Sequence, residues 1–403
     1  MPNPNLPLLY PIFKTIIPPS TLSDETPIFL FLLLQRRHGI FEYLSGVPVT
    51  ERTQFLALND SRDYDLFQNV IHYMYYAISA YGWPMFLITH SKTGICDLCP
   101  NLKCCLLCFG RGDNAQVIED NCCLCNYAAL KQMVAEGDVD VIYATYHVDI
   151  AETPFFVAVD YAKEKIVISI RGTLSMKDVL TDLNAEGEPL PLNPPREDYL
   201  GHKGMVQAAV YIKNKLAEEN LIEKALNHNP SRGTQNFGLV FVGHSLGAGT
   251  ASILAILMKQ DFSNLQCFSY SPPGGLLSMP AVEHSKEFIT SVVVGKDAVP
   301  RIGLHQMEAL RGDLINAIQR SIDPKWKTIA CNMICCCCGP EPKSVQVMSE
   351  KDSRVNAYKE QKDASRHSGH HPNDNSIALT LHHPLFPPGR IIHIVRHHPT
   401  TDE

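Results

Sequence analysis

The sequence contains no apolar run long enough to cross a lipid bilayer. A spanning helix needs about 18 or more consecutive apolar residues, whereas the best run, Pro27 to Leu34, has about half that length. The N-terminus also lacks the basic segment, apolar segment and small-residue cleavage site of a secretory signal. We therefore expect a chain that, as written, neither spans a membrane nor is secreted.

Basic residues are outnumbered by acidic ones and form no run. The 403 residues include 35 Lys and Arg against 42 Asp and Glu, which gives a net charge of -7. Proteins that bind nucleic acid usually carry a concentrated basic face, so we exclude nucleic acid as a partner. Hydrophobic residues make up 45% of the chain, enough for the core of a large globular domain.

Cysteine is abundant, but without a secretory signal the 14 cysteines are poor evidence for a disulfide framework. Three interpretations stay open. The two Cys-x-x-Cys pairs at 96–99 and 122–125 are compatible with a zinc site. The apolar, cysteine-containing stretch 102–109 is compatible with S-acylation near a membrane. In the third interpretation, the thiols are ordinary core or surface groups with no special chemistry.

The chain divides into three parts. Residues 1–60 are rich in proline at first, show no reliable period and form a poorly determined leader. Residues 61–140 form a helical and cysteine-rich segment that packs on the core. Residues 141–403 form the main domain, with an insertion at about 331–384 whose Cys, Pro, Lys, Ser and His content and weak periodicity are typical of a mobile segment.

The second part contains two predicted helices. Apolar and aromatic residues recur at helical spacing over 65–81, and Gly82 to Pro84 supplies the stop. A shorter helix is predicted at 127–134. The aromatic residues of the first helix are expected to face the protein core.

In the third part, β-rich runs alternate with helical patterns. This alternation predicts an α/β sheet whose catalytic groups lie beyond the carboxyl ends of the strands. The first two runs are expected to form a hairpin, and a Pro-rich loop at 189–195 is expected to border a substrate cleft. The predicted strands are 154–159, 165–170, 239–242, 265–270, 288–294 and 391–395, and the predicted helices are 177–183, 203–219 and 250–259.

The main domain is organised around the stretch from Leu239 to Lys259. A β-branched and aromatic run ends on Gly-His-Ser-Leu-Gly, residues 243–247, and passes into an Ala- and Leu-rich helix. This is the strand, tight turn and helix context of a nucleophile elbow, in which the glycines relieve crowding around a strained serine. We expect Ser245 to be displayed there as a nucleophile.

Acyl transfer by a serine also needs a base, a carboxylate that orients the base, and donors for the tetrahedral oxyanion. Asp297 follows the strand 288–294 and is the expected orienting carboxylate. The backbone N–H of Leu246 is one oxyanion donor by elbow geometry. Thr173, just after the strand 165–170, is expected to supply the second donor through its N–H or its hydroxyl.

The sequence offers no securely placed general base. In the chain order Ser, Asp, His, the histidine lies beyond the last strand. His397 and His398 are the candidates at this position, although only five residues follow them. His393 lies within the strand and is equally compatible with a core residue. His244, inside the elbow, is expected to pack structurally because its backbone direction points it away from its neighbour's hydroxyl.

Five motifs occur together: Ser169 to Thr173, Gly201 to Met205, Val242 to Gly249, Tyr270 to Leu277, and Gly295 to Ile302. Together they resemble the class 3 lipases and, within them, the sn-1-specific diacylglycerol lipases of the alpha type. The resemblance covers the chain from about Leu66 to its C-terminus. It implies an α/β-hydrolase fold in which Ser245 matches the family nucleophile and Asp297 the family aspartate.

The same resemblance implies a function. It points to a membrane-associated serine hydrolase at the cytoplasmic face of the plasma membrane, with calcium as cofactor and diacylglycerol in a membrane as substrate. Cleavage of the sn-1 ester would release a fatty acid and a 2-monoacylglycerol such as the endocannabinoid 2-arachidonoylglycerol. Neither calcium nor sn-1 preference follows from the spacing of residues.

The sequence departs from the family pattern at both ends. Relatives begin with four transmembrane helices and continue past the last strand to a helical segment and the catalytic histidine. We therefore expect an incomplete chain, or a variant form, of a diacylglycerol lipase. Two hypotheses follow: an active lipid-ester hydrolase, or a catalytically silent module of the same fold that binds or regulates a partner because its general base is missing.

Overall fold

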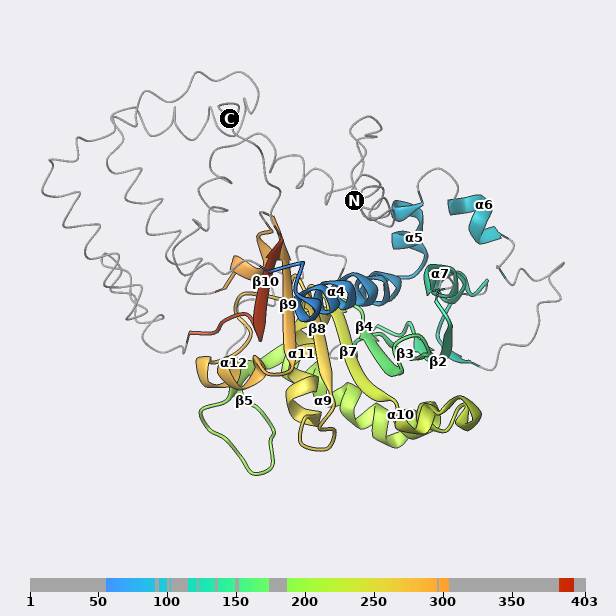
Figure 1. The fold of residues 1–403 in the computed structure, drawn as a ribbon. Coiled ribbons are helices and arrows are strands. Elements are labelled where there is room, and N and C mark those ends of the chain that lie inside the picture. The colour runs from blue at the N-terminus through green and yellow to red at the C-terminus, as the bar shows by residue number, and fades with distance from the viewer. Residues whose placement is uncertain are drawn as a thin grey trace, which may run out of the picture. The chain divides into compact units, whose positions relative to one another are not determined.

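The computed structural model describes parts of the chain between Leu56 and Ile394 (Figure 1). The chain divides into two compact units, residues 1–301 with 385–403, and residues 302–384. The predicted helix at 177–183 and the predicted insertion up to residue 383 lie outside the described residues. The residues that the structure describes are 56–90, 94–99, 102, 115–121, 123–134, 137–148, 152–173, 187–295, 297–303 and 384–394.

Within the described segments, no helix combines the length and the apolar character that a bilayer crossing requires.

The first unit is built on a mixed sheet whose described strands follow the order β1-β2-β3-β4-β7-β8-β9-β10. Strands β4 and β7 to β10 run parallel, and β3 pairs antiparallel with both β2 and β4. The predicted hairpin is therefore present. The strands are β1 Gln116–Ile118, β2 Val139–Thr145, β3 Phe155–Asp160, β4 Lys165–Ile170, β7 Gly238–His244, β8 Gln266–Tyr270, β9 Ile289–Val294 and β10 Arg390–Ile394, with β5 Gly187–Pro189 and β6 Leu200–His202 in a small separate sheet.

The central strands carry apolar side chains on both faces of the sheet. In β7, Leu239 and Phe241 belong to one hydrophobic cluster and Val240 and Val242 to another, as the alternation of a strand covered on both sides requires. Helices α9 to α11 cover one face and α4 the other (Figure 1). This arrangement confirms the predicted α/β-hydrolase fold. The helices are α4 Ser61–Ser79, α5 Trp83–Thr89, α6 Gly94–Leu98, α7 Cys125–Val134, α9 Lys203–Glu218, α10 Leu221–Leu226, α11 Leu246–Met258 and α12 Met279–Ser285.

Helix α4 is held to the sheet by hydrogen bonds as well as by packing. Its buried face includes Val70 and Tyr76. The Tyr270 hydroxyl at the end of β8 donates to the Val70 carbonyl (2.5 Å), and the Ser169 hydroxyl in β4 donates to the Tyr76 carbonyl (2.8 Å). Two strands therefore fix the backbone of α4 at two separate turns.

A buried carboxylate also ties α4 to the sheet. Asp160, at the end of β3, is fully buried. Its Oδ2 lies 2.5 Å from Nε2 of His72 and accepts from the Tyr76 hydroxyl (2.9 Å), and its Oδ1 accepts from the Lys163 N–H (3.0 Å). Burial opposes ionisation of Asp160, but these hydrogen bonds outweigh it and hold the pKa of Asp160 below its ordinary value.

The first helix ends just before the predicted stop, and a second helix follows at once. Helix α4 ends at Ser79, but Gly82 adopts a φ of 70° and a new helix, α5, begins at Trp83. Proline is well tolerated in the first turn of a helix, where its missing N–H has no partner to lose. Pro84 therefore lies in the first turn of α5, and the corner at Gly82 separates that helix from α4.

Candidate active site

The turn between β7 and α11 has the geometry of a strained elbow. Ser245 has a φ of 59° and a ψ of -128°, and non-glycine residues rarely adopt a positive φ. Its N–H donates to the Tyr270 carbonyl (2.9 Å), and its own carbonyl accepts from the Ala248 N–H (2.9 Å). These bonds hold the serine in its strained conformation.

Close backbone approach explains the glycines on either side of Ser245. A Cβ on Gly243 would lie 2.2 Å from the Gly247 carbonyl oxygen, and a Cβ on Gly247 would lie 2.4 Å from that of Ile170. The elbow therefore packs directly against the carboxyl end of β4. Ser245 exposes only 6% of its surface, so the residue expected to be displayed is buried in this structure.

Asp297 lies just beyond β9 and is half-buried. Its Oδ2 accepts from the Ser271 hydroxyl, and its Oδ1 accepts from the Val299 N–H (3.0 Å). Ser271 directly follows Tyr270, whose carbonyl accepts from the Ser245 N–H, so the carboxylate is linked to the elbow through these two neighbours. Burial lowers the pKa of His244, and the charge of Asp297 opposes that shift. The structure thus brings Asp297 and the elbow to one edge of the sheet. Ser271 was not among the residues predicted from the sequence.

Leu246 and Thr173, the two predicted oxyanion donors, lie on segments that meet beside the elbow. Leu246 opens α11, so its N–H has no carbonyl acceptor within its own helix. Thr173 follows Gly172, where a Cβ would lie 3.3 Å from that of Ser245. Both residues are therefore placed near the serine, and their roles stay predictions.

The general base also stays a prediction, because His397 and His398 lie outside the described residues. His393 is exposed on β10, and its Nε2 lies 2.8 Å from a main-chain carbonyl oxygen after β9. Because a carbonyl only accepts, that nitrogen carries a proton in this contact. His244 places its Nδ1 2.8 Å from the Tyr81 hydroxyl, which agrees with the packing role expected for it.

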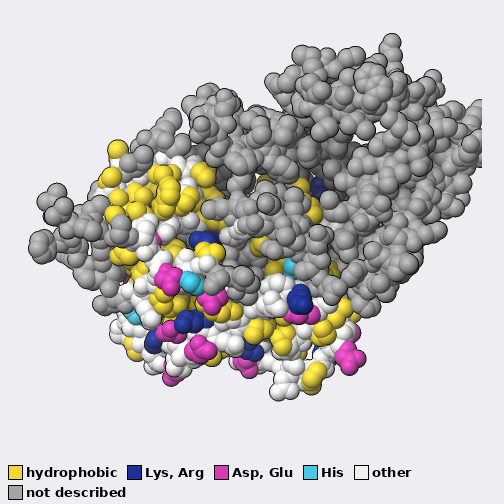
Figure 2. Space-filling view, turned by 180° about the vertical axis from the view of Figure 1, so that it is seen from behind, with side chains coloured by type: hydrophobic (Ala, Val, Ile, Leu, Met, Phe, Trp, Pro, Cys, Tyr) yellow, Lys and Arg dark blue, Asp and Glu magenta, His cyan; other side chains and the backbone are white. Residues whose placement is uncertain are grey.

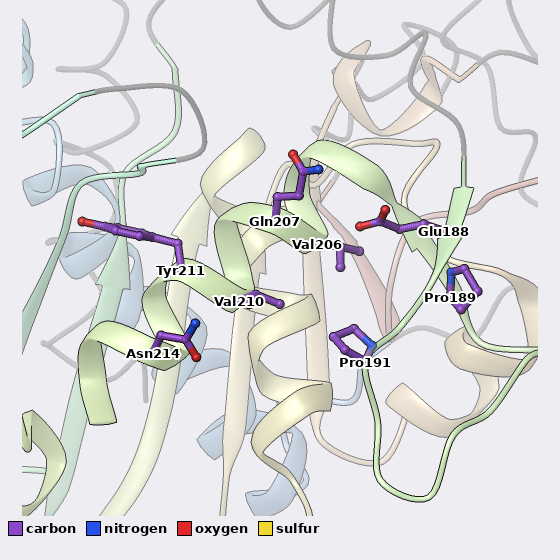
Figure 3. Close-up of a pocket in the computed structure, with 8 residues that line it drawn as sticks. All are labelled: Glu188, Pro189, Pro191, Val206, Gln207, Val210, Tyr211 and Asn214. Atoms are coloured by element: carbon purple, nitrogen blue, oxygen red, sulfur yellow. The ribbon is translucent and has the colours of Figure 1, made fainter. Parts of the chain in front are cut away.

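A pocket of about 570 Å³ lies on the outer side of α9, beside the loop that follows β5 (Figure 3). Pro189 and Pro191 border it, but the substrate cleft predicted beside this loop stays a prediction. The lining of the pocket includes no residue of the elbow, and we assign it no part in the chemistry. The lining residues are Glu188, Pro189, Pro191, Val206, Gln207, Val210, Tyr211 and Asn214.

Metal binding finds no support in the described part of the chain. There, no group of three or more His, Cys, Asp and Glu residues lies close enough together to hold an ion. The described cysteines form no disulfide, and burial raises the pKa of Cys267 to about 12. The first Cys-x-x-Cys pair is described, but Cys122 of the second is not, so the zinc interpretation stays untested.

Hydrophobic side chains gather over α5, α6 and α7, at the upper left of Figure 2, whereas charged side chains are interspersed over the lower part of the visible described face. Two large apolar side chains of α5 are exposed: Trp83 has 41% of its surface accessible and Ile88 has 54%. Exposed apolar groups that occur together often mark a surface of interaction.

Two solved lipase structures align with part of the chain. A fungal lipase aligns with 60% of this chain and 76% of its own, at 22% identity and a TM-score of 0.42. The mono- and diacylglycerol lipase of Aspergillus oryzae aligns with 58% of this chain and 73% of its own, at 19% identity and a TM-score of 0.41.

Sequence relatives are more informative. Residues 167–307 match the family model described as Lipase (class 3). Diacylglycerol lipase-alpha of Rattus norvegicus is 46% identical over 374 residues, 91% of this chain and 35% of that protein. Diacylglycerol lipase-beta of Mus musculus is 36% identical over 262 residues, 65% of this chain and 38% of that protein. The chain spans about a third of the length of these curated relatives. By these matches, residues 167–307 form a segment of the class 3 lipase type, and the chain is similar to part of the diacylglycerol lipases.

Proposed function

We propose that this chain is a serine hydrolase that cleaves an acyl ester of diacylglycerol. The proposal is carried by the strained elbow of Ser245, which lies against the segment bearing Thr173 and shares its sheet edge with Asp297. Relatives named as diacylglycerol lipases support the choice of substrate.

In the proposed reaction, Ser245 Oγ attacks the ester carbonyl carbon while a general base takes its proton. The N–H groups of Leu246 and Thr173 stabilise the oxyanion, by about 3 kcal/mol each. The tetrahedral intermediate expels the glycerol oxygen, which takes the proton from the base and leaves an acyl-enzyme. Water, deprotonated by the same base, then attacks the acyl-enzyme. The second tetrahedral intermediate expels Ser245 Oγ, which takes the proton back from the base as the fatty acid is released.

Asp297 orients the base in this scheme, and its bonds to Ser271 and Val299 fix the carboxylate. The base is a histidine beyond β10, for which His397 and His398 are the candidates within the chain. The silent-module hypothesis is the less favoured one, because the curated relatives are named as lipases.

The finer assignments follow the family resemblance. We propose the sn-1 ester as the bond cleaved, a 2-monoacylglycerol such as 2-arachidonoylglycerol as product, and endocannabinoid synthesis as the role. Calcium stays a proposed cofactor, and no step of the reaction is derived through it. We also propose action at the cytoplasmic face of the plasma membrane. The exposed apolar side chains of Trp83 and Ile88 support contact with a lipid surface.

The test combines fluorophosphonate labelling with hydrolysis of diacylglycerol in lipid vesicles, the two acyl chains carrying different labels. We expect labelling at Ser245 and release of the sn-1 chain first. Ser245→Ala should abolish both signals, since loss of a triad member costs on the order of a million-fold. Ser252→Ala, a matched buried serine of α11, should keep them.

Different results contradict different parts of the proposal. A folded chain that is not labelled contradicts the active enzyme. Early release of the sn-2 chain contradicts only the position of cleavage. Unchanged hydrolysis after calcium is removed with EGTA contradicts the calcium assignment alone.

A further inference from the structure

Tyr81 occupies the corner between α4 and α5 and is 3% exposed. The corner is closely fixed, because Gly82 beside it has a φ of 70° and a Cβ there would lie 2.3 Å from Oδ1 of Asn126 on α7. The Tyr81 N–H donates to the Ile78 carbonyl (3.1 Å). The position of the tyrosine is therefore set by α4 and α7, outside the 167–307 segment that matches the lipase family model.

The hydroxyl of Tyr81 meets two segments of the candidate active site. It lies 2.8 Å from Nδ1 of His244 and 3.4 Å from the His244 carbonyl oxygen. A Cβ on Gly172 would lie 2.5 Å from this hydroxyl and 3.3 Å from the Cβ of Ser245. The oxygen thus fills the space between the end of β4 and the elbow.

The ionisation states suit a neutral hydrogen bond. Burial raises the pKa of Tyr81, and the charge of Arg171 and then the backbone of Gly172 oppose that rise. Burial lowers the pKa of His244, so its imidazole is neutral at pH 7. With the histidine proton on Nε2, the Tyr81 hydroxyl donates to Nδ1 of His244, and its oxygen lies against the backbone of Gly172.

We propose that Tyr81 is a positioning residue for ester hydrolysis, whose hydroxyl joins the segment bearing Thr173 to the elbow bearing Ser245. The inference rests on the proposed function. If the two segments move apart, the oxyanion donors lose their alignment with the serine, and misplacement by about 1 Å costs about 100-fold in rate. The α4–α5 corner is then part of the site.

The test is Tyr81→Phe in the whole chain. This change keeps the ring, which meets the His244 ring edge-on at 5.8 Å, and removes only the hydroxyl. We expect kcat and the rate of fluorophosphonate labelling to fall by about 10-fold to 100-fold, with KM within about twofold. Tyr76→Phe is the matched control, because Tyr76 is equally buried on α4 but bonds to Asp160.

Labelling of Tyr81→Phe within about twofold of the unmodified chain overturns the proposal. So does an equal loss in Tyr76→Phe at equal thermal destabilisation, because packing alone would then account for both.

A second measurement needs no activity, and so separates failure of this inference from failure of the proposed function. Hydrogen exchange followed by mass spectrometry should show the Gly172 N–H protected in the unmodified chain. In Tyr81→Phe its exchange should rise by about tenfold while peptides from β8 keep their rates. A Gly172 N–H that exchanges without protection in the unmodified chain contradicts the inference even if Tyr81→Phe does not fold, and so does unchanged exchange in the variant.

Discussion

Ser271 holds Asp297 from an unfavourable backbone conformation. Its φ is 52°, where a serine is strained, yet its hydroxyl reaches Oδ2 of the carboxylate. Strain of this kind persists only where the surrounding contacts enforce it. The hydroxyl therefore acts on the carboxylate that orients the proposed base.

Two substitutions at Ser271 should separate the effect of the hydroxyl from the effect of the backbone strain. Ser271→Gly removes both, so we expect the labelling rate to fall by about tenfold while the free energy of unfolding rises by about 0.5 to 1 kcal/mol. Ser271→Ala removes only the hydroxyl, so it should lose the same rate without the gain in stability. Labelling kinetics and urea unfolding measure the two effects.

A control for that prediction lies in the β3–β4 hairpin. Glu164 is exposed and has a φ of 54°. Glu164→Gly should raise stability without changing the labelling rate. A full labelling rate in Ser271→Gly would show that the hydroxyl does not serve the carboxylate.

Among single residues of the site, the local sequence predicted those whose role is indicated by their neighbours in the chain. Ser245 and Asp297 each follow a recognisable strand, and the structure brings both to one edge of the sheet. The partners of the site were missed because they are distant in sequence. Ser271 lies 26 residues from Asp297, and Tyr81 lies 163 residues from His244. A single sequence carries no period that reports such contacts.

Among the elements, α4 depends on a buried charge. Asp160 bonds to His72 and Tyr76 of this helix, and its pKa lies below the ordinary value. We expect Asp160→Asn to lower the free energy of unfolding by about 3 kcal/mol at pH 7, because removing one partner of a buried pair leaves the other uncompensated. Urea unfolding of both chains measures the difference.

The dependence of this effect on pH has a definite sign. A carboxyl group with a lowered pKa in the folded state stabilises the fold above the ordinary value of about 3.9, and the contribution is lost as the pH falls through the folded value. The difference in the free energy of unfolding between the unmodified chain and Asp160→Asn should therefore be full at pH 7 and disappear in acid. Asp261→Asn, at an exposed site, should show no such difference. A difference that stays constant down to strong acid would assign the loss to packing.

The strongly patterned elements were predictable, and the others show what sequence leaves out. Strands β3, β4, β7, β8, β9 and β10 and helices α4, α7, α9 and α11 lie close to their predicted ranges. Strand β2, Val139–Thr145, was not predicted. Its pairing with β3 is irregular between Val141 and Tyr143, so its side chains do not keep the strict alternation that identifies a strand.

For the whole molecule, the hydrophobic cluster that contains Val240 and Val242 shows that the folded domain extends beyond residues 167–307, the segment that matches the family model. Val70, Tyr73 and Tyr76 of α4 pack in the same cluster as Val242 and Phe268 of the central sheet. Each large apolar side chain contributes about 1.5 to 3 kcal/mol when buried, against a total stability of about 5 to 15 kcal/mol. The sheet therefore cannot keep this face uncovered.

Removal of α4, together with the elements that follow it up to α7, should accordingly abolish the fold. A chain that begins at residue 137 is expected to aggregate or to unfold without cooperativity, whereas a chain that begins at residue 56 keeps every described element and should unfold cooperatively. Circular dichroism during thermal unfolding measures both. Cooperative unfolding of the shorter chain at the same midpoint would show that α4 is an appendage.

The hydroxyls of Tyr270 and Ser169, which bond to α4 at two separate turns, also have a mechanical consequence. Sliding the helix along its axis by one residue, about 1.5 Å, breaks both bonds at once. Helix α4 is therefore mechanically coupled to the sheet and does not slide along it independently. A pull on its leading end is carried into β4 and β8, and the segments that leave the carboxyl ends of those strands carry Thr173 and Ser271.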